Sequence, residues 1–127
     1  MFFKKEAGAP LSISGVEDYS SIRIVRLRGP IDRTTVVEIE RFRKWVAQHK
    51  GFKHKHILLD FKDVTHMDTS AVAEIMQAVS ELKGIHYRVG LLHLKETFRS
   101  MLKMLKVEQW VVVYDDEAHA VDDLIKP

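Results

Sequence analysis

Short apolar runs of strand length alternate with helical stripes along almost the whole chain, and this alternation constrains the fold most. The clearest run is residues 57–61, Ile-Leu-Leu-Asp-Phe, in which apolar residues do not alternate with polar ones. Such a run is typical of a strand that helices cover on both faces. Further strands are predicted at residues 11–17, 22–27, 87–92 and 110–114.

Four helices are predicted between and after these strands. The first begins at Asp32, a good N-cap residue, although Thr35 with Glu38 offers an alternative capping box; Gly51 ends it. The apolar residues expected to face the sheet recur at three- and four-residue spacing: Val36, Ile39, Phe42 and Val46 in the first helix; Val72, Ile75, Met76, Val79 and Leu82 in the second, which begins at about Thr69; Phe98, Met101, Leu102 and Leu105 in the third; Ala118, Val121, Leu124 and Ile125 in the last.

The order of these elements predicts an α/β fold. The polar interval 18–21 suits a hairpin between the first two strands. Strands joined through helices favour a mixed, mostly parallel sheet, here with one antiparallel strand from the N-terminal hairpin and about four flanking helices. Gly29-Pro30 is expected to end the second strand, and residues 63–68 to form a loop. Residues 1–10 are interpreted as a flexible tail, and 11–127 as a single domain.

Composition excludes several classes of protein. The 127 residues contain no cysteine, so disulfides and thiolate zinc sites are excluded. No apolar run is long enough to span a bilayer and no secretory signal is present, so we expect a cytoplasmic protein without membrane insertion. A net charge of +2 is too small to indicate nucleic-acid binding. A basic block at 41–55 and an acidic block at 108–123 indicate solvated helix faces or, alternatively, a polarised surface that orients a partner.

Motifs for catalysis and for cofactors are missing from the sequence. There is no phosphate-binding glycine loop and no Gly-x-Ser-x-Gly elbow. His54 and His56 have a spacing that can chelate a metal, but neighbouring lysines oppose a cation, and surface histidines are the simpler interpretation. We therefore predict no enzyme activity, no catalytic residue, no metal and no cofactor.

Asp60, Asp63 and Asp68 follow or end a predicted strand, where ligand sites of open α/β sheets gather. Three acids there could hold Mg²⁺, which raises the alternative of a receiver-like phospho-aspartate domain. That alternative requires an acidic pair after the first strand and a lysine after the last. The sequence offers neither and begins with two strands rather than a strand and a helix.

Asp68, Thr69 and Ser70 stand at the junction between the third strand and the second helix. Two interpretations are open from the residues alone. Asp, Thr and Ser are good helix caps, and capping is the simpler one. A hydroxyl at this position would also accept a phosphate group well, because unpaired N–H groups and the positive end of the helix dipole gather there.

Two segments of the chain carry a resemblance to a known family. Residues 22–32, an apolar strand followed by Gly-Pro-Ile-Asp, resemble the entry to the first helix of the STAS domain. Residues 57–70 resemble its segment of strand, Asp, turn and apolar-Asp-Ser-Ser-Gly, with Thr69 in place of the first serine and Ala71 in place of the glycine. The likeness extends over roughly residues 11–125.

The resemblance implies a phosphorylation-regulated protein-binding module similar to an anti-sigma factor antagonist, which works by partner switching in transcription regulation. It implies phosphorylation at Thr69, or less favourably Ser70, by a partner anti-sigma factor of the serine/threonine kinase type. Asp32, Asp68, Thr69 and Ser70 would form the partner-binding site. The alternative is a non-phosphorylated STAS adaptor subunit of a transport or signalling complex. A sulfate-transporter tail is not expected, and the chain would be a monomer or weak homodimer.

Overall fold

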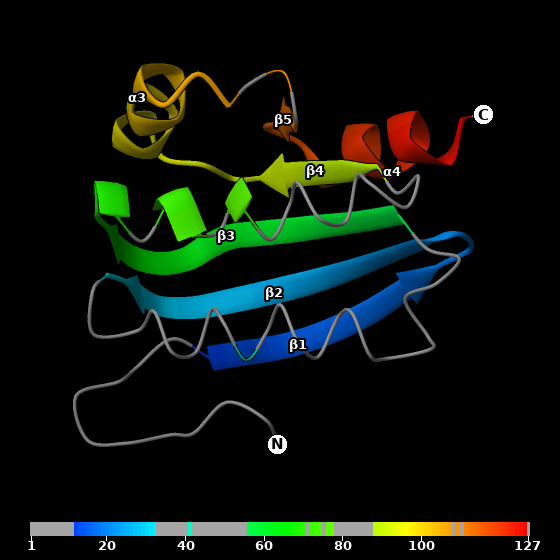
Figure 1. Cartoon of the computed structure of the whole chain (residues 1–127). Helices are drawn as coiled ribbons and strands as arrows, with labels where there is room; N and C mark the ends of the chain where they lie inside the picture. The colour runs from blue at the N-terminus through cyan, green and yellow to red at the C-terminus, as the bar shows by residue number, and fades with distance from the viewer. Residues whose placement is uncertain are drawn as a thin grey trace.

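Five strands pair side by side in the order β1-β2-β3-β4-β5 (Figure 1). The computed structural model describes residues 12–32, 41, 56–70, 72–74, 76–77, 88–107, 109 and 111–126. Residues 69–70, 72–74 and 76–77 are helical. The elements with defined bounds are β1 (Ser12–Tyr19), β2 (Ile22–Ile31), β3 (His56–Met67), β4 (Val89–Leu92), α3 (Glu96–Met104), β5 (Val112–Tyr114) and α4 (Glu117–Ile125).

The pairing directions confirm the predicted fold class. β1 is antiparallel to β2, and every later neighbour in the sheet pairs in parallel. Sequence-neighbouring strands are therefore also neighbours in the sheet. The receiver-like alternative does not fit, because doubly wound folds of that type place a parallel first strand inside the sheet in the order 2-1-3-4-5.

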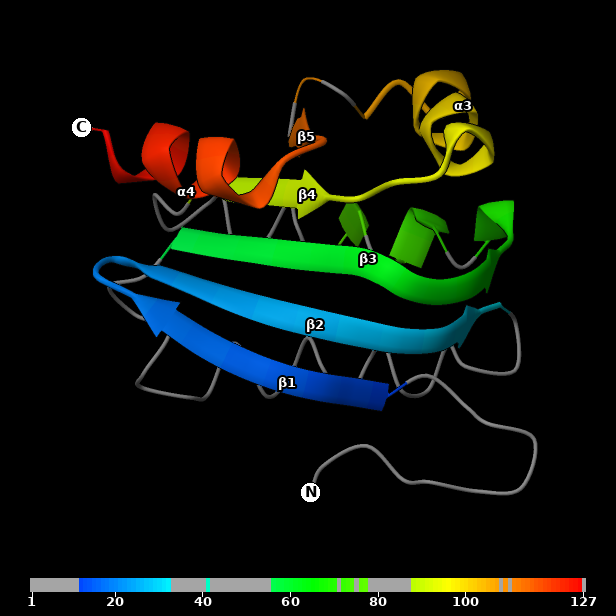
Figure 2. The same cartoon turned by 180° about the vertical axis from the view of Figure 1, so that it is seen from behind.

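Apolar residues pack on both faces of the sheet, in two clusters. In β3, Ile57, Leu59 and Phe61 belong to the larger cluster, which also contains residues of α3 and the helical residues Val72 and Met76. Leu58 lies on the opposite face with Ala120 and Leu124 of α4. Figures 1 and 2 show α4 and the helical segment after β3 on opposite sides of the sheet. The unalternated run is thus explained by burial on both faces.

The helical stripes agree with prediction in part. Val72 and Met76 are buried, as are Phe98 and Leu102, while Met101 and Leu105 are partly buried. The other predicted stripe positions lie outside the described residues: Val36, Ile39, Phe42 and Val46 of the first helix, and Ile75, Val79 and Leu82 of the second. The tail 1–10 and the rest of the first helix, apart from Asp32 and Arg41, also lie outside them.

In α4 the predicted inward face is wrong at two positions. Ala118 and Ile125 are exposed, whereas Ala120 is fully buried. The helix begins after Asp116, the N-cap, whose carboxylate accepts a hydrogen bond from the backbone N–H of His119. The face that packs on the sheet carries Ala120 and Leu124, four residues apart, and at 3.6 residues per turn Ala118 and Ile125 point away from it.

Strands β2 and β3 are longer than predicted. Gly29-Pro30 does not end β2, which continues to Ile31, and residues 63–67 are strand rather than loop. Two shifts in the register between β2 and β3 explain the disagreement. From Arg26 to Arg28 β2 advances two residues while β3 advances three, and from Gly29 to Pro30 β2 advances one residue while β3 advances two. Such bulges place consecutive polar residues on the exposed side and disrupt the alternation that marks a strand in the sequence.

Gly90 should be intolerant of a side chain, because it lies under a buried aromatic ring. A Cβ there would stand 2.8 Å from a ring carbon of Tyr114 and 3.1 Å from a methyl of Leu58. We expect Gly90→Ala to lower the free energy of unfolding by about 1–3 kcal/mol, measured by urea denaturation. The matched control is Gly15→Ala, whose Cβ would meet no atom within 4 Å; an equal loss in both variants would contradict this packing.

Candidate functional site

The junction after β3 brings the four predicted site residues together. The backbone N–H of Asp68 donates to the carbonyl oxygen of Ile31 at 3.0 Å, so the ends of β2 and β3 are joined there. Asp32 follows Ile31 directly and therefore stands beside Asp68. The carbonyl oxygen of Asp68 accepts from the N–H of Val72 at 3.0 Å, which makes Asp68 the residue that begins the helix.

The two hydroxyl groups at this junction have different surroundings. Ser70 Oγ donates a hydrogen bond of 2.9 Å to Asp68 Oδ1, so this hydroxyl is held by the residue that begins the helix. Thr69 is exposed, and its hydroxyl makes no hydrogen bond with any residue that the structure describes. Of the two, Thr69 therefore has the hydroxyl available to another molecule.

A cluster of charged side chains lies on the sheet face that α4 covers, and sequence reasoning missed it. Arg26 is at its centre: its Nε lies 3.0 Å from Glu17 Oε1, and its Nη1 lies 2.8 Å from both Asp60 Oδ2 and Glu117 Oε1. His93 Nδ1 lies 2.9 Å from Asp60 Oδ1. The only sequence signal was Asp60 itself, a charge inside an otherwise apolar strand.

Asp60 is buried, and its charge is stabilised by its partners. Burial raises the pKa of a carboxyl group, but the hydrogen bonds from His93, from the backbone N–H of Lys62 and from Arg26 outweigh it, so the pKa of Asp60 is lowered. Arg26 likewise lowers the pKa of Glu17. The ionised cluster ties β1, β2, β3, the end of β4 and the start of α4 together.

The candidate metal ligands do not come together. Asp60 belongs to the charged cluster, Asp63 is exposed on β3 and Asp68 begins the helix. His56 Nδ1 accepts a hydrogen bond from the backbone N–H of Arg88, and burial, then the charge of Arg88, lowers the pKa of His56. His54 lies outside the described residues. Across the described part of the chain, no group of three or more potential ligands is placed to hold a metal ion.

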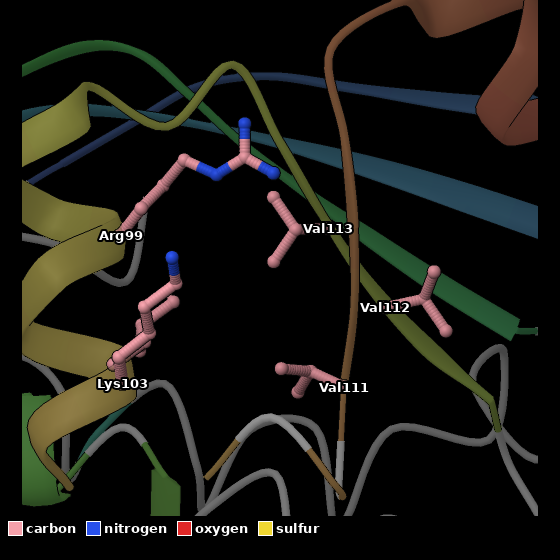
Figure 3. A pocket seen from close by; sticks show the side chains of 6 residues that line it. Arg99, Lys103, Val111, Val112 and Val113 are labelled. Carbon is pink, nitrogen blue, oxygen red and sulfur yellow. The ribbon is translucent and has the colours of Figure 1, made fainter. Parts of the chain in front are cut away.

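A small cavity of about 260 Å³ lies between α3 and β5 (Figure 3). Val111 and Val113 point toward α3, whereas Val112 points to the other side of its strand. Arg99 and Lys103 of α3 flank the opening, and Arg99 Nη1 lies 3.1 Å from Asp115 Oδ1. The cavity combines an apolar floor with a charged border.

The sheet order, its single antiparallel edge strand and the helix that begins at Asp68 fit the family that the sequence resembles. A family model for the STAS domain matches residues 15–120. The chain belongs to the STAS domain family. The match runs from β1 into α4 and so includes the Asp68 junction and the charged cluster of this STAS domain.

Solved structures with the same fold include anti-sigma factor antagonists. A Thermotoga maritima protein assigned as one has a TM-score of 0.74 at 18% identity, covering 88% of this chain and 94% of that one. Bacillus SpoIIAA in its phosphorylated form has a TM-score of 0.62 at 22% identity, covering 86% of this chain and 96% of that one. SpoIIAA in its unphosphorylated form has a TM-score of 0.61 at 22% identity, with coverages of 86% and 94%.

A comparison with curated protein sequences finds no match. No helix among the described residues is long and apolar enough to span a bilayer.

Asp60→Asn should destabilise this STAS domain, because the substitution leaves Arg26 and His93 without their buried carboxylate. We expect a loss of about 2–4 kcal/mol in the free energy of unfolding at neutral pH, measured by urea denaturation. Asp63→Asn is the matched control, since Asp63 is exposed on the same strand and should change stability by less than about 0.5 kcal/mol.

Comparing wild type with Asp60→Asn at different pH values tests the charge state of Asp60. The folded-state pKa of Asp60 is lowered, so its charge stabilises the fold above the ordinary carboxyl range, about pH 4. That contribution is lost as the pH falls through the lowered folded value. The difference between wild type and Asp60→Asn should therefore shrink in acid, and a difference that grows in acid would contradict the assigned charge state.

Proposed function

We propose that this STAS domain is a phosphorylation-regulated protein-binding module that acts as an anti-sigma factor antagonist, with Thr69 as the phosphorylated residue. Its partner would be an anti-sigma factor of the serine/threonine kinase type, and the binding surface would include Asp32, Asp68, Thr69 and Ser70. The proposal takes the protein to be cytoplasmic, a regulator of transcription, and a monomer or weak homodimer.

The observation that carries the proposal is the contrast between the two hydroxyls of the junction. Ser70 Oγ is bonded to Asp68, whereas Thr69 is exposed and its hydroxyl has no hydrogen-bond partner among the described residues. A kinase requires an accessible hydroxyl, and modifying the Thr69 hydroxyl breaks no hydrogen bond to a described residue. The family assignment and the phosphorylated form of SpoIIAA give independent support.

A phosphate on Thr69 would act on a partner more than on the domain. It adds about −1.5 to −2 charges at pH 7, next to the carboxylates of Asp32 and Asp68. The positive end of the helix dipole stabilises the phosphate charge by about 0.3–1 kcal/mol, and the exposed position leaves the phosphate group hydrated. A partner surface packed on this spot would instead meet a dense negative charge that it must desolvate.

The proposed function contains no catalytic step of its own. We expect the purified protein to show no nucleotide hydrolysis and to carry no stoichiometric zinc or magnesium, measured by phosphate release and by elemental analysis. A tightly bound metal at His54, His56 or Asp60 would contradict this part of the proposal.

Thr69→Glu tests the switch directly. The added carboxylate should weaken partner binding at least about tenfold, equivalent to roughly 1.4 kcal/mol, while leaving the melting temperature nearly unchanged. Thr69→Ala should bind as wild type but resist phosphorylation by the partner kinase. The partner is first isolated by pull-down, and affinities are then measured by calorimetry with phosphorylation followed by mass spectrometry.

Thr97→Glu is the matched control, because Thr97 is another exposed threonine in the first turn of a helix, α3. Its substitution adds the same charge away from the Asp68 junction and should leave the affinity unchanged. If Thr69→Glu and wild type bind the partner equally, Thr69 is an exposed residue of the first helical turn without a switching role. The non-phosphorylated adaptor function would then replace the proposed switch.

A further inference from the structure

We propose that a second site, on the bulged end of β3, binds the phosphate group of a phosphate monoester. The site is an open cavity of about 410 Å³, here called the β3 pocket, lined by Arg28, Lys62, Asp63, Val64, Thr65 and Lys95. It contains none of the four residues assigned to partner binding, and the inference does not rest on the proposed function.

The two register shifts of β3 build this pocket. Because of the first shift, Lys62 and Asp63 are both exposed, although they are consecutive in a strand. Arg28 is the direct neighbour of Asp63 in the register with β2, and it is exposed as well. The second shift exposes Thr65 with His66. Cations from two strands and a hydroxyl group are thereby gathered on one side of the sheet end.

Two of the cations have no partner among the residues that the structure describes. In the described ranges, neither the Arg28 guanidinium nor the Lys62 ammonium makes a hydrogen bond or ion pair with another side chain. Other arginines of the sheet are paired: Arg23 with Asp18 at 2.7 Å, and Arg26 with three carboxylates. Although Asp63 is the register neighbour of Arg28, the two form no ion pair. The donors of Arg28 and Lys62 are thus available to a ligand.

The third cation is held in place before any ligand binds. Lys95 Nζ donates a hydrogen bond of 3.0 Å to the carbonyl oxygen of Val64, and the same ammonium lies 5.6 Å from the centre of the Phe98 ring. An ammonium has three donors, so two remain for a ligand. Fixing a long side chain in advance reduces the entropy lost on binding.

Charge and size favour a phosphate monoester over a carboxylate. Three cations and the Asp63 carboxylate leave the lining with a net charge of +2, which matches the charge of about −1.5 to −2 that a phosphate monoester carries at pH 7. Guanidinium binds phosphate oxygens with two parallel hydrogen bonds. The cavity is also many times larger than the roughly 30 Å³ that one water occupies, so it has room for the organic part of a monoester.

The test is a titration of the purified full chain, followed by amide chemical shifts in two-dimensional NMR. The probes are glycerol 3-phosphate, inorganic phosphate and acetate, each at the same ionic strength set with sodium chloride. We expect saturable shifts centred on Arg28, Lys62, Thr65 and Lys95 with both phosphate probes, and no saturable shift with acetate. Tighter binding of glycerol 3-phosphate than of inorganic phosphate, measured from the titrations, identifies the monoester as the ligand class. Tighter binding of inorganic phosphate identifies free phosphate as the ligand.

Substitutions of Arg28 and Lys62 test whether phosphate binds in the β3 pocket. Arg28→Ala and Lys62→Gln should each weaken phosphate binding about tenfold or more, as the loss of a charge-assisted contact requires. Both side chains are exposed and without a partner among the described residues, so the folded spectrum should be retained. Lys103→Gln, at an exposed lysine of α3, is the control and should bind as wild type. Equal shifts with acetate and phosphate, or undiminished binding by Arg28→Ala and Lys62→Gln, would overturn the proposal.

Discussion

The parallel pairing of β2 with β3 is the constraint on which the rest of this STAS domain depends. Its register sets Arg26 opposite Asp60, so the ion pair at the centre of the charged cluster is a direct neighbour contact across two strands. The same ladder ends with Ile31 opposite Met67, which places Asp32 beside Asp68. One pairing therefore positions both the buried cluster and the candidate partner-binding site.

The buried charged cluster and the exposed Asp68 junction lie at different places along the sheet, so the proposed switch is separate from the ionised contacts of the cluster. Arg26 and Asp60 fix the middle of the sheet through ionised, hydrogen-bonded contacts, away from the end where Thr69 lies. A charge added at Thr69 would therefore act on a rigid support and change the surface rather than the fold. The β3 pocket lies close to that surface, because four extended residues from Thr65 to Thr69 span at most about 14 Å.

The sequence predicted what depends on local periodicity and missed what depends on distant partners. The strand at 57–61 and the stripe through Val72 and Met76 were predicted from spacing alone. Residues 63–67 were misassigned because two bulges remove the two-residue period. The role of Asp60 could not be predicted, since Arg26 and His93 stand more than 30 residues away in the chain. The Asp68 junction was found from its capping residues and was given a function by the family resemblance, but the exposure of Thr69 required the structure.

The bulges of β3 also fix the phase of the chain that follows them. Each extra residue reverses the face to which later side chains point, so Phe61, Val64 and Met67 reach the same core at three-residue intervals. Deleting one residue at either bulge would turn Met67 out of that core and shift the start of the next helix by one position. Length changes between β3 and this helix are therefore constrained by geometry, and alignments of related chains should place their gaps elsewhere.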